Sequence, residues 1–417
     1  MSSRVRRFGP LLGLAFLGCG ALAGCGGGGG GGTGVGDTTP PPASTSQILV
    51  AATSLQNLED LCARKNSSVI GPVEGTSYYL VEVPAGVTAD EFKHDLEDEF
   101  EVEDADDDEG AGVPEGGGST IPVFLGDDVA AIASQTAMTT IGVPTARTRG
   151  YDGTGVVVAV IDTGIVASNP AIVGHLAPGG RDFVDGDNDP NDVGNGLDDD
   201  GDGLIDEGVG HGTFVASLIL AVAPNAKILP IRALNSDAVG TASTVAKAIA
   251  YAVAQGADVI NLSAGLARAL LVIDQAVANA KASDVYVVSC AGNRGLPQID
   301  FPADLSDVRG IAALDASSRK ATFSSWSSAV DFSAPGVGLI GAHPGGANGT
   351  ARWSGTSFST ALVTGAFALL RGHDPITPGK DLWKRLEDTA VPLDALNPLY
   401  AGKLGRGRID LAAATAP

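Results

Sequence analysis

"GVVVAVID", residues 155–162, is an unbroken run of small and β-branched apolar residues that ends on an aspartate. A strand with one face in water alternates apolar and polar residues, and this run does not alternate. It is therefore typical of a strand in a parallel sheet that helices cover on both faces. Asp162 would then lie at the carboxyl end of its strand, where the sites of open α/β sheets form.

Similar apolar runs and helical patterns alternate along the rest of the chain. We expect an α/β fold with a doubly wound, mostly parallel sheet over residues 123–417, because strand, helix and strand in series give right-handed crossovers. The predicted strands are "AKILPIRAL" (226–234), "ADVINLS" (257–263), "DVYVVSCAGN" (284–293) and "RGIAALD" (309–315), and the predicted helices are Thr213–Val222, Ser243–Gln255 and Ala269–Ala282.

A smaller unit precedes this domain. Residues 47–103 follow the order β-α-β-β-α-β, which predicts a small α+β domain of the ferredoxin-like type. Its second helix has a clear start, with Thr88 as N-cap and Glu91 three residues later in a capping box. Residues 104–122 are acidic and rich in glycine, and we expect them to form a disordered linker.

The N-terminus has the features of an export signal. Three arginines precede an apolar run of 13 residues, Leu11–Ala23, which is too short to span a bilayer. Residues 1–24 are therefore predicted to be a signal peptide. The sequence "LAGC" (22–25) is similar to the lipobox of bacterial lipoproteins, in which the cysteine is acylated. This predicts an exported protein of the bacterial cell envelope that is attached to the membrane only through lipid on Cys25; the alternative is an ordinary signal peptide with an incidental cysteine.

Residues 25–46, rich in glycine and proline, form the predicted tether behind Cys25. Two later cysteines, Cys62 and Cys290, are not expected to pair in a disulfide. The formal charge of −23, from 26 basic and 49 acidic residues, excludes nucleic acid as a partner. We expect a monomer.

Three further motifs carry side chains suited to one reaction. Asp162 stands in "VIDTG", His211 in "GHGTFVAS" and Ser357 in "SGTSFSTALVTG". A serine hydroxyl becomes a nucleophile when an imidazole takes its proton, and a buried carboxylate holds that imidazole in one tautomer. The chain order Asp, His, Ser is one of the known orders of such a triad. These residues therefore predict nucleophilic catalysis by Ser357.

With these motifs, residues 135–414 resemble the subtilisin-like serine proteases, and "FSSWSSAVDFSAPGV" and "GRGRIDLAAA" are similar to that family as well. The resemblance implies a serine endopeptidase that acts on proteins or peptides without a cofactor for the chemistry. It implies that Asn293 supplies an oxyanion donor beside the backbone N–H of Ser357. It also implies that an extended substrate pairs with two segments, residues 263–265 and residues 237–243. A third segment, "CAGN" (290–293), would enclose the substrate side chain before the cut. The substrate-binding residues are Ser263, Ala264, Gly265, Gly240, Ala291 and Gly292. Of these, Ala264, Gly265, Ala291 and Gly292 would leave room for a large apolar side chain.

The resemblance further gives the domain at 47–103 the role of a propeptide, which makes the protein a zymogen that its own propeptide inhibits. Processing in the linker would release the peptidase from its anchor; the alternative is a permanent spacer domain. Ala361 stands where the family usually has proline, which keeps a peptide ligase open as an alternative activity. A calcium-dependent binding protein on an inactive protease fold is a further alternative.

An acidic loop lies shortly before His211. "DDDGDGLIDEG", residues 198–208, approximates a calcium loop with ligands Asp198, Asp200, Asp202, the carbonyl of Leu204, and Asp206. The position that normally holds a bidentate glutamate is Val209, so Asp187 or Asp189 would complete the set. This predicts a structural Ca²⁺, with a solvated acidic turn as the alternative. The same carboxylates would favour the charged form of His211, and a bound Ca²⁺ would cancel that effect.

Overall fold

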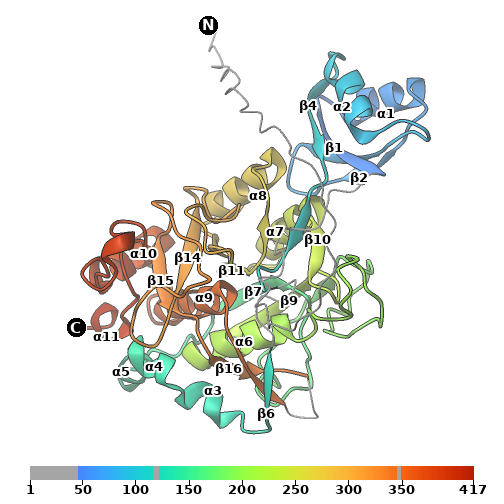
Figure 1. Cartoon of the computed structure of the whole chain (residues 1–417). Helices are drawn as coiled ribbons and strands as arrows, with labels where there is room; N and C mark the ends of the chain where they lie inside the picture. The colour runs from blue at the N-terminus through green and yellow to red at the C-terminus, as the bar shows by residue number, and fades with distance from the viewer. Residues whose placement is uncertain (1–45, 116–121, 345–348) are drawn as a thin grey trace, which may run out of the picture. The chain divides into compact units, whose positions relative to one another are not determined.

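The computed structural model describes residues 46–115, 122–344 and 349–417 (Figure 1). The signal peptide, Cys25, the tether up to residue 45 and residues 116–121 of the linker lie outside the described residues. In the part that is described, no helix is long and apolar enough to cross a membrane. Cys62 and Cys290 are both buried and free.

Residues 47–107 form the small α+β domain with the predicted order of elements. The elements are β1 (Gln47–Ala52), α1 (Leu55–Arg64), β2 (Val69–Pro72), β3 (Tyr78–Glu82), α2 (Ala89–Glu97) and β4 (Val102–Asp107). The strands pair antiparallel in the order β2-β3-β1-β4, as in a ferredoxin-like fold. Thr88 and Glu91 make the predicted capping box at the start of α2. Ile48 and Val50 of β1 pack under α1 and α2, whereas Leu49 on the other face joins a hydrophobic core of the larger domain.

The larger domain is built on a parallel sheet of seven strands in the order β15-β14-β13-β11-β7-β9-β8. The four strands predicted downstream of residue 162 are all present in it, and their side chains are buried on both faces, which explains why the sequence does not alternate. The strands are β7 (Val157–Asp162), β8 (Arg181–Asp182), β9 (Lys227–Arg232), β11 (Val259–Leu262), β13 (Tyr286–Cys290), β14 (Val308–Leu314) and β15 (Phe332–Pro335).

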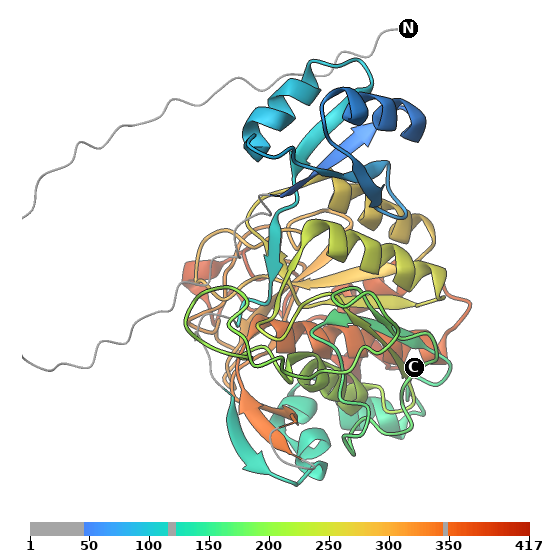
Figure 2. The ribbon, with the colours of Figure 1, turned by 90° about the vertical axis from the view of Figure 1, so that its right-hand side faces the viewer.

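Helices cover both faces of this sheet (Figure 2). α7 (Ala242–Ala254) and α8 (Leu271–Ala282) pack on one face, and α6 (His211–Val222) and α9 (Thr356–His373) on the other. Nearly every side chain of α9 is buried, because this helix lies between the sheet and α6. The remaining helices are α3 (Ala130–Ser134), α4 (Thr136–Thr140), α5 (Val143–Thr148), α10 (Gly379–Thr389), a 3-10 turn at Pro398–Tyr400, and α11 (Leu411–Ala414).

The segment predicted to be a disordered linker differs from the expectation. Residues 104–107 belong to β4, and β5 (Gly110–Gly112) pairs antiparallel with β10 (Val239–Thr241) on one side and with β12 (Gly265–Leu266) on the other. Local composition predicted disorder, but strands more than 120 positions away in the sequence supply its backbone partners. A third small sheet joins β16 (Leu339–Ala342), β17 (Thr350–Trp353) and β6 (Val123–Gly126).

Candidate active site

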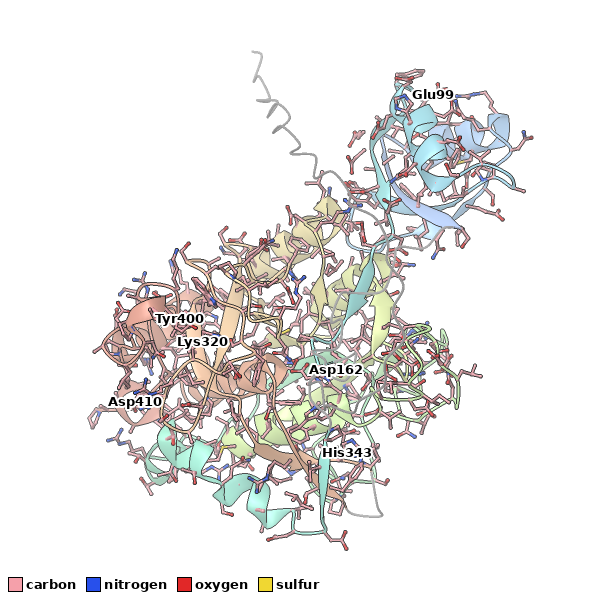
Figure 3. All side chains as sticks on the ribbon, viewed as in Figure 1. Glu99, Asp162, Lys320, His343, Tyr400 and Asp410 are labelled. Atoms are coloured by element: carbon pink, nitrogen blue, oxygen red, sulfur yellow. The ribbon has the colours of Figure 1, made fainter. Side chains whose placement is uncertain are left out.

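Asp162 and His211 lie together at the carboxyl end of the parallel sheet. Asp162, labelled in Figure 3, is the last residue of β7, and His211 is the first residue of α6. His211 Nδ1 is 2.8 Å from Asp162 Oδ1, and both side chains are fully buried. Gly212 makes this approach possible, because a Cβ at this position would lie 2.2 Å from the carbonyl oxygen of Gly164.

The charge state of His211 follows from its neighbours. Burial by itself would lower the pKa of His211, but the carboxylates of Asp162 and Glu115 outweigh it and raise the pKa to about 10. The acidic loop at 198–208 was expected to exert this effect, whereas the carboxylates that raise the pKa most belong to Asp162 and Glu115. Both carboxylates therefore favour the charged imidazole over the neutral form that a general base requires.

Asp192 is a buried carboxylate beside the same site that the sequence analysis missed. Its Oδ2 accepts hydrogen bonds from the N–H of Gly210, at 2.9 Å, and from the hydroxyl of Thr213, at 3.1 Å. Burial, and then the charge of Asp162, raise the pKa of Asp192 to about 7. Asp192 thus ties down the first turn of α6 and with it the backbone of His211.

Ser357 reaches the same place from α9. It is the second residue of that helix and is fully buried. Its Oγ donates a hydrogen bond to Glu115 Oε2 at 2.7 Å, and the same oxygen lies 3.3 Å from His211 Nε2, although the second contact lacks hydrogen-bond geometry. Ser357 Oγ and His211 Nε2 therefore flank one carboxylate oxygen. The structure brings together the three side chains that the sequence motifs singled out.

Asn293 lies beside the start of α9 with a free donor. Its Oδ1 accepts hydrogen bonds from the backbone N–H and the hydroxyl of Thr356, at 3.0 and 2.9 Å. These bonds fix which end of the carboxamide is the donor, and the buried Nδ2 has no partner among the described residues. A buried amide N–H without an acceptor is costly unless a ligand supplies one. Nδ2 of Asn293 is therefore available as a donor beside the start of α9.

The predicted substrate-binding residues lie on three segments around Ser357. Gly240 is in β10 and Gly265 in β12, and they pair with Ala111 and Gly112 of β5 respectively. The carbonyl of Ser263 is 3.5 Å from Ser357 Oγ, and Ala264, next in the chain, is buried. The N–H groups of the third segment are held in place, that of Ala291 by the carbonyl of Ile311 at 2.9 Å and that of Gly292 by the hydroxyl of Thr356 at 3.2 Å.

The space beside Gly265 and Gly292 departs from the expectation. A Cβ on Gly265 would lie 2.9 Å from the side chain of Asp300, and one on Gly292 would lie 2.2 Å from it. The glycines therefore leave room for Asp300 of this chain, and the room predicted for a large apolar substrate side chain holds a carboxylate instead.

Glu115 is the principal residue of this site that the sequence analysis missed. It follows β5 by three residues, and only 3% of its surface is exposed. Its Oε1 accepts from the backbone N–H of Ser357 at 3.3 Å while its Oε2 accepts from the hydroxyl. A Cβ on Gly355 would lie 1.6 Å from Oε1, so the backbone of Gly355 forms the floor under this carboxylate. No sequence motif marks Glu115, because its role depends on where β5 is held.

Further contacts fix the segment that carries Glu115. Asp108 is fully buried, and its two carboxylate oxygens accept from the N–H and the hydroxyl of Ser243, both at 2.8 Å, at the start of α7. Asp106 and Glu109 bind the guanidinium of Arg268. The acidic side chains, whose abundance predicted disorder, are thus bound by specific donors of the larger domain.

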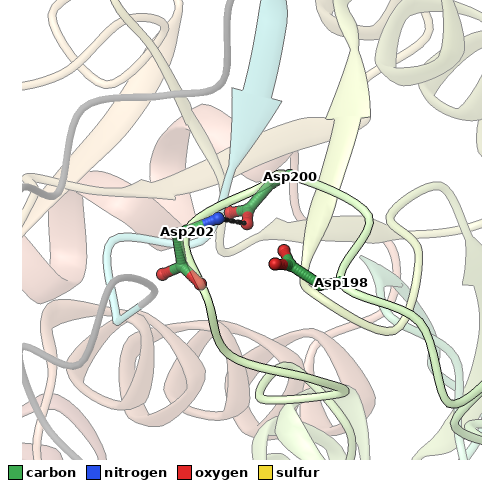
Figure 4. Close-up of side chains that lie close together, drawn as sticks. All are labelled: Asp198, Asp200 and Asp202. Atoms are coloured by element: carbon green, nitrogen blue, oxygen red, sulfur yellow. Dashed lines mark hydrogen bonds between the residues drawn. The ribbon is translucent and has the colours of Figure 1, made fainter.

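The acidic loop contains two overlapping groups of carboxylates. Asp198, Asp200 and Asp202 offer oxygens within 4.8 Å of one another (Figure 4), and Asp200 also groups with Glu207 and Asp237. Asp206 does not join either group, because its carboxylate accepts from the N–H groups of Asn195 and Gly196.

Glu207 and Asp237 therefore replace Asp206 in the group that the structure brings together, and the sequence pattern did not include them. Leu204 is exposed, and its N–H donates to Asp202 Oδ1 at 2.8 Å. Asp187 Oδ1 accepts from the N–H of Asp189 at 2.8 Å, and neither residue belongs to the two groups of acids.

Known proteins are similar to this chain in sequence and in fold. The model of the subtilase family matches residues 153–409. Alkaline elastase YaB from Bacillus sp. (strain YaB) is 34% identical over 281 residues, which cover 65% of this chain and 68% of that protein. Subtilisin BL from Lederbergia lenta is 33% identical over 281 residues, 65% of this chain and 95% of its own.

The fold is also that of fervidolysin from Fervidobacterium pennivorans, a keratinolytic enzyme related to subtilisin, with a TM-score of 0.73 at 22% identity. That likeness covers 92% of this chain and 62% of fervidolysin. The family model and the two relatives lead to one conclusion. The chain belongs to the subtilase family of serine endopeptidases.

Proposed function

We propose that the protein is an exported serine endopeptidase that hydrolyses peptide bonds of protein substrates with Asp162, His211 and Ser357. The observation that carries the proposal is the meeting of Ser357 Oγ and His211 Nε2 at one carboxylate oxygen, with Asp162 hydrogen-bonded to the other imidazole nitrogen. Three motifs separated by 49 and 146 positions would have no structural need to meet in this way.

The proposed reaction proceeds in two halves. Ser357 Oγ attacks the carbonyl carbon of the peptide bond while its proton passes to His211 Nε2, and the carbonyl oxygen becomes an oxyanion. The N–H of Ser357 and Nδ2 of Asn293 donate to that oxygen. The proton then passes to the leaving nitrogen as the C–N bond breaks. A water molecule cleaves the resulting ester by the same steps, and no cofactor takes part.

The substrate would bind as an added strand between β10 and β12. β5 of this chain already makes backbone pairs of that kind with Gly240 and Gly265, which supports the proposal. Most of the recognition would then involve the substrate backbone.

We also propose that the chain is made as a zymogen, with residues 47–115 as the inhibitory propeptide. β5 occupies the position proposed for the substrate, and Glu115 accepts both donors of Ser357. With Glu115 in place, His211 stays protonated and Ser357 is blocked. Catalysis requires that this segment leaves, which cutting of the chain after Glu115 would allow.

A structural Ca²⁺ in the acidic loop completes the proposal. The donor set of Asp200, Glu207 and Asp237 consists of carboxylate oxygens, the ligands that Ca²⁺ prefers. Both oxygens of Glu207 are enclosed and accept no hydrogen bond from the described residues. Burial, followed by the charges of Asp237, Asp202 and Asp200, raises the pKa of Glu207 to about 7. A cation would relieve this repulsion, so the site fits Ca²⁺, which has no part in the chemistry.

We propose that the protein reaches the bacterial cell envelope by its signal peptide and is anchored through lipid on Cys25, with processing as the route of release. This part rests on the N-terminal sequence. The peptidase would act as a monomer, and protein substrates and its own propeptide would be its partners.

The catalytic proposal is tested by labelling the processed protein with a fluorophosphonate, which reacts with an activated serine. We expect the label on Ser357 of the wild type and none on Ser357→Ala, whose cleavage of denatured casein falls to background. Asn293→Ala should fold normally and lose about a hundredfold to a thousandfold in kcat, a magnitude taken from a subtilisin. A wild type that neither labels nor cleaves would indicate a binding protein on an inactive protease fold.

A further inference from the structure

Asp300 lies between two of the segments proposed to bind substrate. Its backbone N–H donates to the carbonyl of Ala291 at 3.1 Å, and the carbonyl of its neighbour Phe301 accepts from the N–H of Leu266 at 2.8 Å. The dipeptide 300–301 therefore joins the turn after β13 to β12. By the family resemblance, the turn after β13 encloses the substrate side chain before the cut, and the segment of β12 pairs with the substrate backbone.

The side chain of Asp300 turns into the space between those segments. A Cβ built on Gly292 would lie 2.2 Å from Asp300 Oδ2, and one built on Gly265 would lie 3.2 Å from the same oxygen. Oδ2 therefore faces both glycines. Only 8% of the residue is exposed in the inhibited chain.

The two oxygens of this carboxylate have different surroundings. Oδ1 binds Nη2 of Arg294, the residue that follows Asn293. Oδ2 accepts no hydrogen bond from the residues that the structure describes, and it is the oxygen that faces the glycines. A carboxylate held by one guanidinium nitrogen retains acceptor positions for a second donor. The vacant acceptor positions therefore lie on the side where the substrate side chain would enter.

The charge of Glu115 supports the same conclusion. Burial and the nearby carboxylates of Asp304 and Glu115 raise the pKa of Asp300, whereas Arg294 lowers it. Glu115 lies beside Ser357, and its carboxylate accepts hydrogen bonds from the N–H and the hydroxyl of Ser357. An acidic side chain that entered this buried space would be repelled by the carboxylate of Asp300, so it is unsuited to the space.

We propose that Asp300 is a specificity-determining residue that selects lysine or arginine immediately before the scissile bond. The cationic group of the substrate would bind Oδ2, and Arg294 would hold the charge of Asp300 when no substrate is bound. This inference rests on the proposed endopeptidase function and adds its substrate class. Because residues 115–122 contain no lysine or arginine, the proposed cut in this stretch has to proceed within the chain at a site that the pocket does not favour.

The test uses the full-length chain after processing and a set of internally quenched peptides that differ only in the residue before the cut. We expect the wild type to give the highest kcat/KM with Lys and Arg, a lower value with Leu and the lowest with Glu. Asp300→Asn should lower the ratio of kcat/KM for Lys over Leu at least about tenfold, because it removes one partner of a buried charge pair. The loss should fall mainly on kcat/KM for the Lys peptide.

Asp307→Asn is the matched control, because it removes a carboxylate of the same segment that binds Lys281, and it should leave the Lys-to-Leu ratio close to that of the wild type. If Asp300→Asn does not fold, Arg294→Gln is the second variant. It frees the carboxylate of Asp300 and should raise the ratio of kcat/KM for Lys over Leu. A wild type that prefers Leu or Glu, or an Asp300→Asn variant that keeps the ratio, would overturn the inference while the endopeptidase proposal stands. If no peptide is cut and Ser357 takes no fluorophosphonate, both fail together.

Discussion

Glu115 and His211 form the contact that decides whether the site can work. A general base must be neutral at the working pH, and a carboxylate 3.3 Å from Nε2 opposes this by stabilising the charged imidazole. The inhibitory segment therefore blocks Ser357 sterically and also keeps the base of the triad protonated.

Replacing Glu115 by glutamine should separate these two effects. In a Ser357→Ala background, which prevents processing, we expect Glu115→Gln to lower the proton affinity of His211 at least about tenfold, because one of its two carboxylate neighbours is lost. The pKa of His211, raised to about 10 with Glu115 in place, can be followed by NMR titration of the ring.

The sign of the linked stability change follows from that pKa. The protonated His211 stabilises the inhibited chain fully below about pH 6.5, and this contribution is lost as the pH rises toward 10. Glu115→Gln should therefore destabilise the chain more at pH 6 than at pH 10. Glu109→Gln is the control, since that carboxylate binds Arg268 on the surface. Equal titration curves for His211 in both variants would contradict the proposed role of Glu115.

Residues with a local motif could be predicted from the sequence, and residues without one could not. Asp162, His211 and Ser357 each stand at the end or the start of an element with a distinctive neighbourhood, so the pattern indicated both their place and their chemistry. Glu115 and Asp300 stand in unremarkable surroundings. Their importance depends on which distant backbone they face, Ser357 in one case and Gly265 with Gly292 in the other, and local sequence does not contain that information.

At the scale of elements, burial made the parallel sheet predictable and composition made β5 unpredictable. Strands covered on both faces must be apolar throughout, which identified β9, β11, β13 and β14. β5 consists of two glycines around one alanine and follows a run of acids, which is the composition of a linker. β5 is held in place by tertiary contacts, namely its pairing with β10 and β12 and the hydrogen bonds between Asp108 and Ser243.

The acidic loop allows a sharper test of Ca²⁺ than chelation alone. In EDTA, Glu207→Gln should be at least as stable as the wild type, because it removes a buried carboxylate that the charges of Asp237, Asp202 and Asp200 repel. In Ca²⁺ at a hundredfold excess over Kd, the wild type should gain about 2.7 kcal/mol and the variant much less. Thermal unfolding with and without EDTA measures both.

The pH dependence of the EDTA form gives a second readout. The pKa of Glu207 is raised to about 7 in the metal-free chain, so its burial should lower stability as the pH rises from about 4.5 to about 7. Ca²⁺ should abolish that decline. Asp187→Asn, an exposed acid outside both groups, serves as the control. Identical responses of Glu207→Gln and the wild type to Ca²⁺ would refute the site.

At the scale of the whole molecule, the small domain and its tail make one continuous set of contacts with the peptidase. Leu49 of β1 belongs to the hydrophobic core that α7 and α8 line, Asp108 binds the start of α7, and Glu115 ends at Ser357. Inhibition and attachment therefore depend on the same stretch of chain, because residues 46–115 lie between the proposed lipid on Cys25 and the peptidase. A cut after Glu115 would break the covalent link and free the site to bind substrate.

This coupling predicts where each form of the protein is found in the cell. The wild type, once processed between Glu115 and the start of β6, should leave the membrane fraction, whereas Ser357→Ala should remain there at full length with an acylated Cys25. Mass spectrometry of both fractions reports the lipid and the new N-terminus at once. Cys25→Ala in the Ser357→Ala background is the matched control, and it should be soluble at full length, because the lipid alone anchors the chain. If the wild type and Ser357→Ala partition equally, the peptidase does not release itself, and the small domain is then a permanent spacer whose tail must be displaced by the substrate.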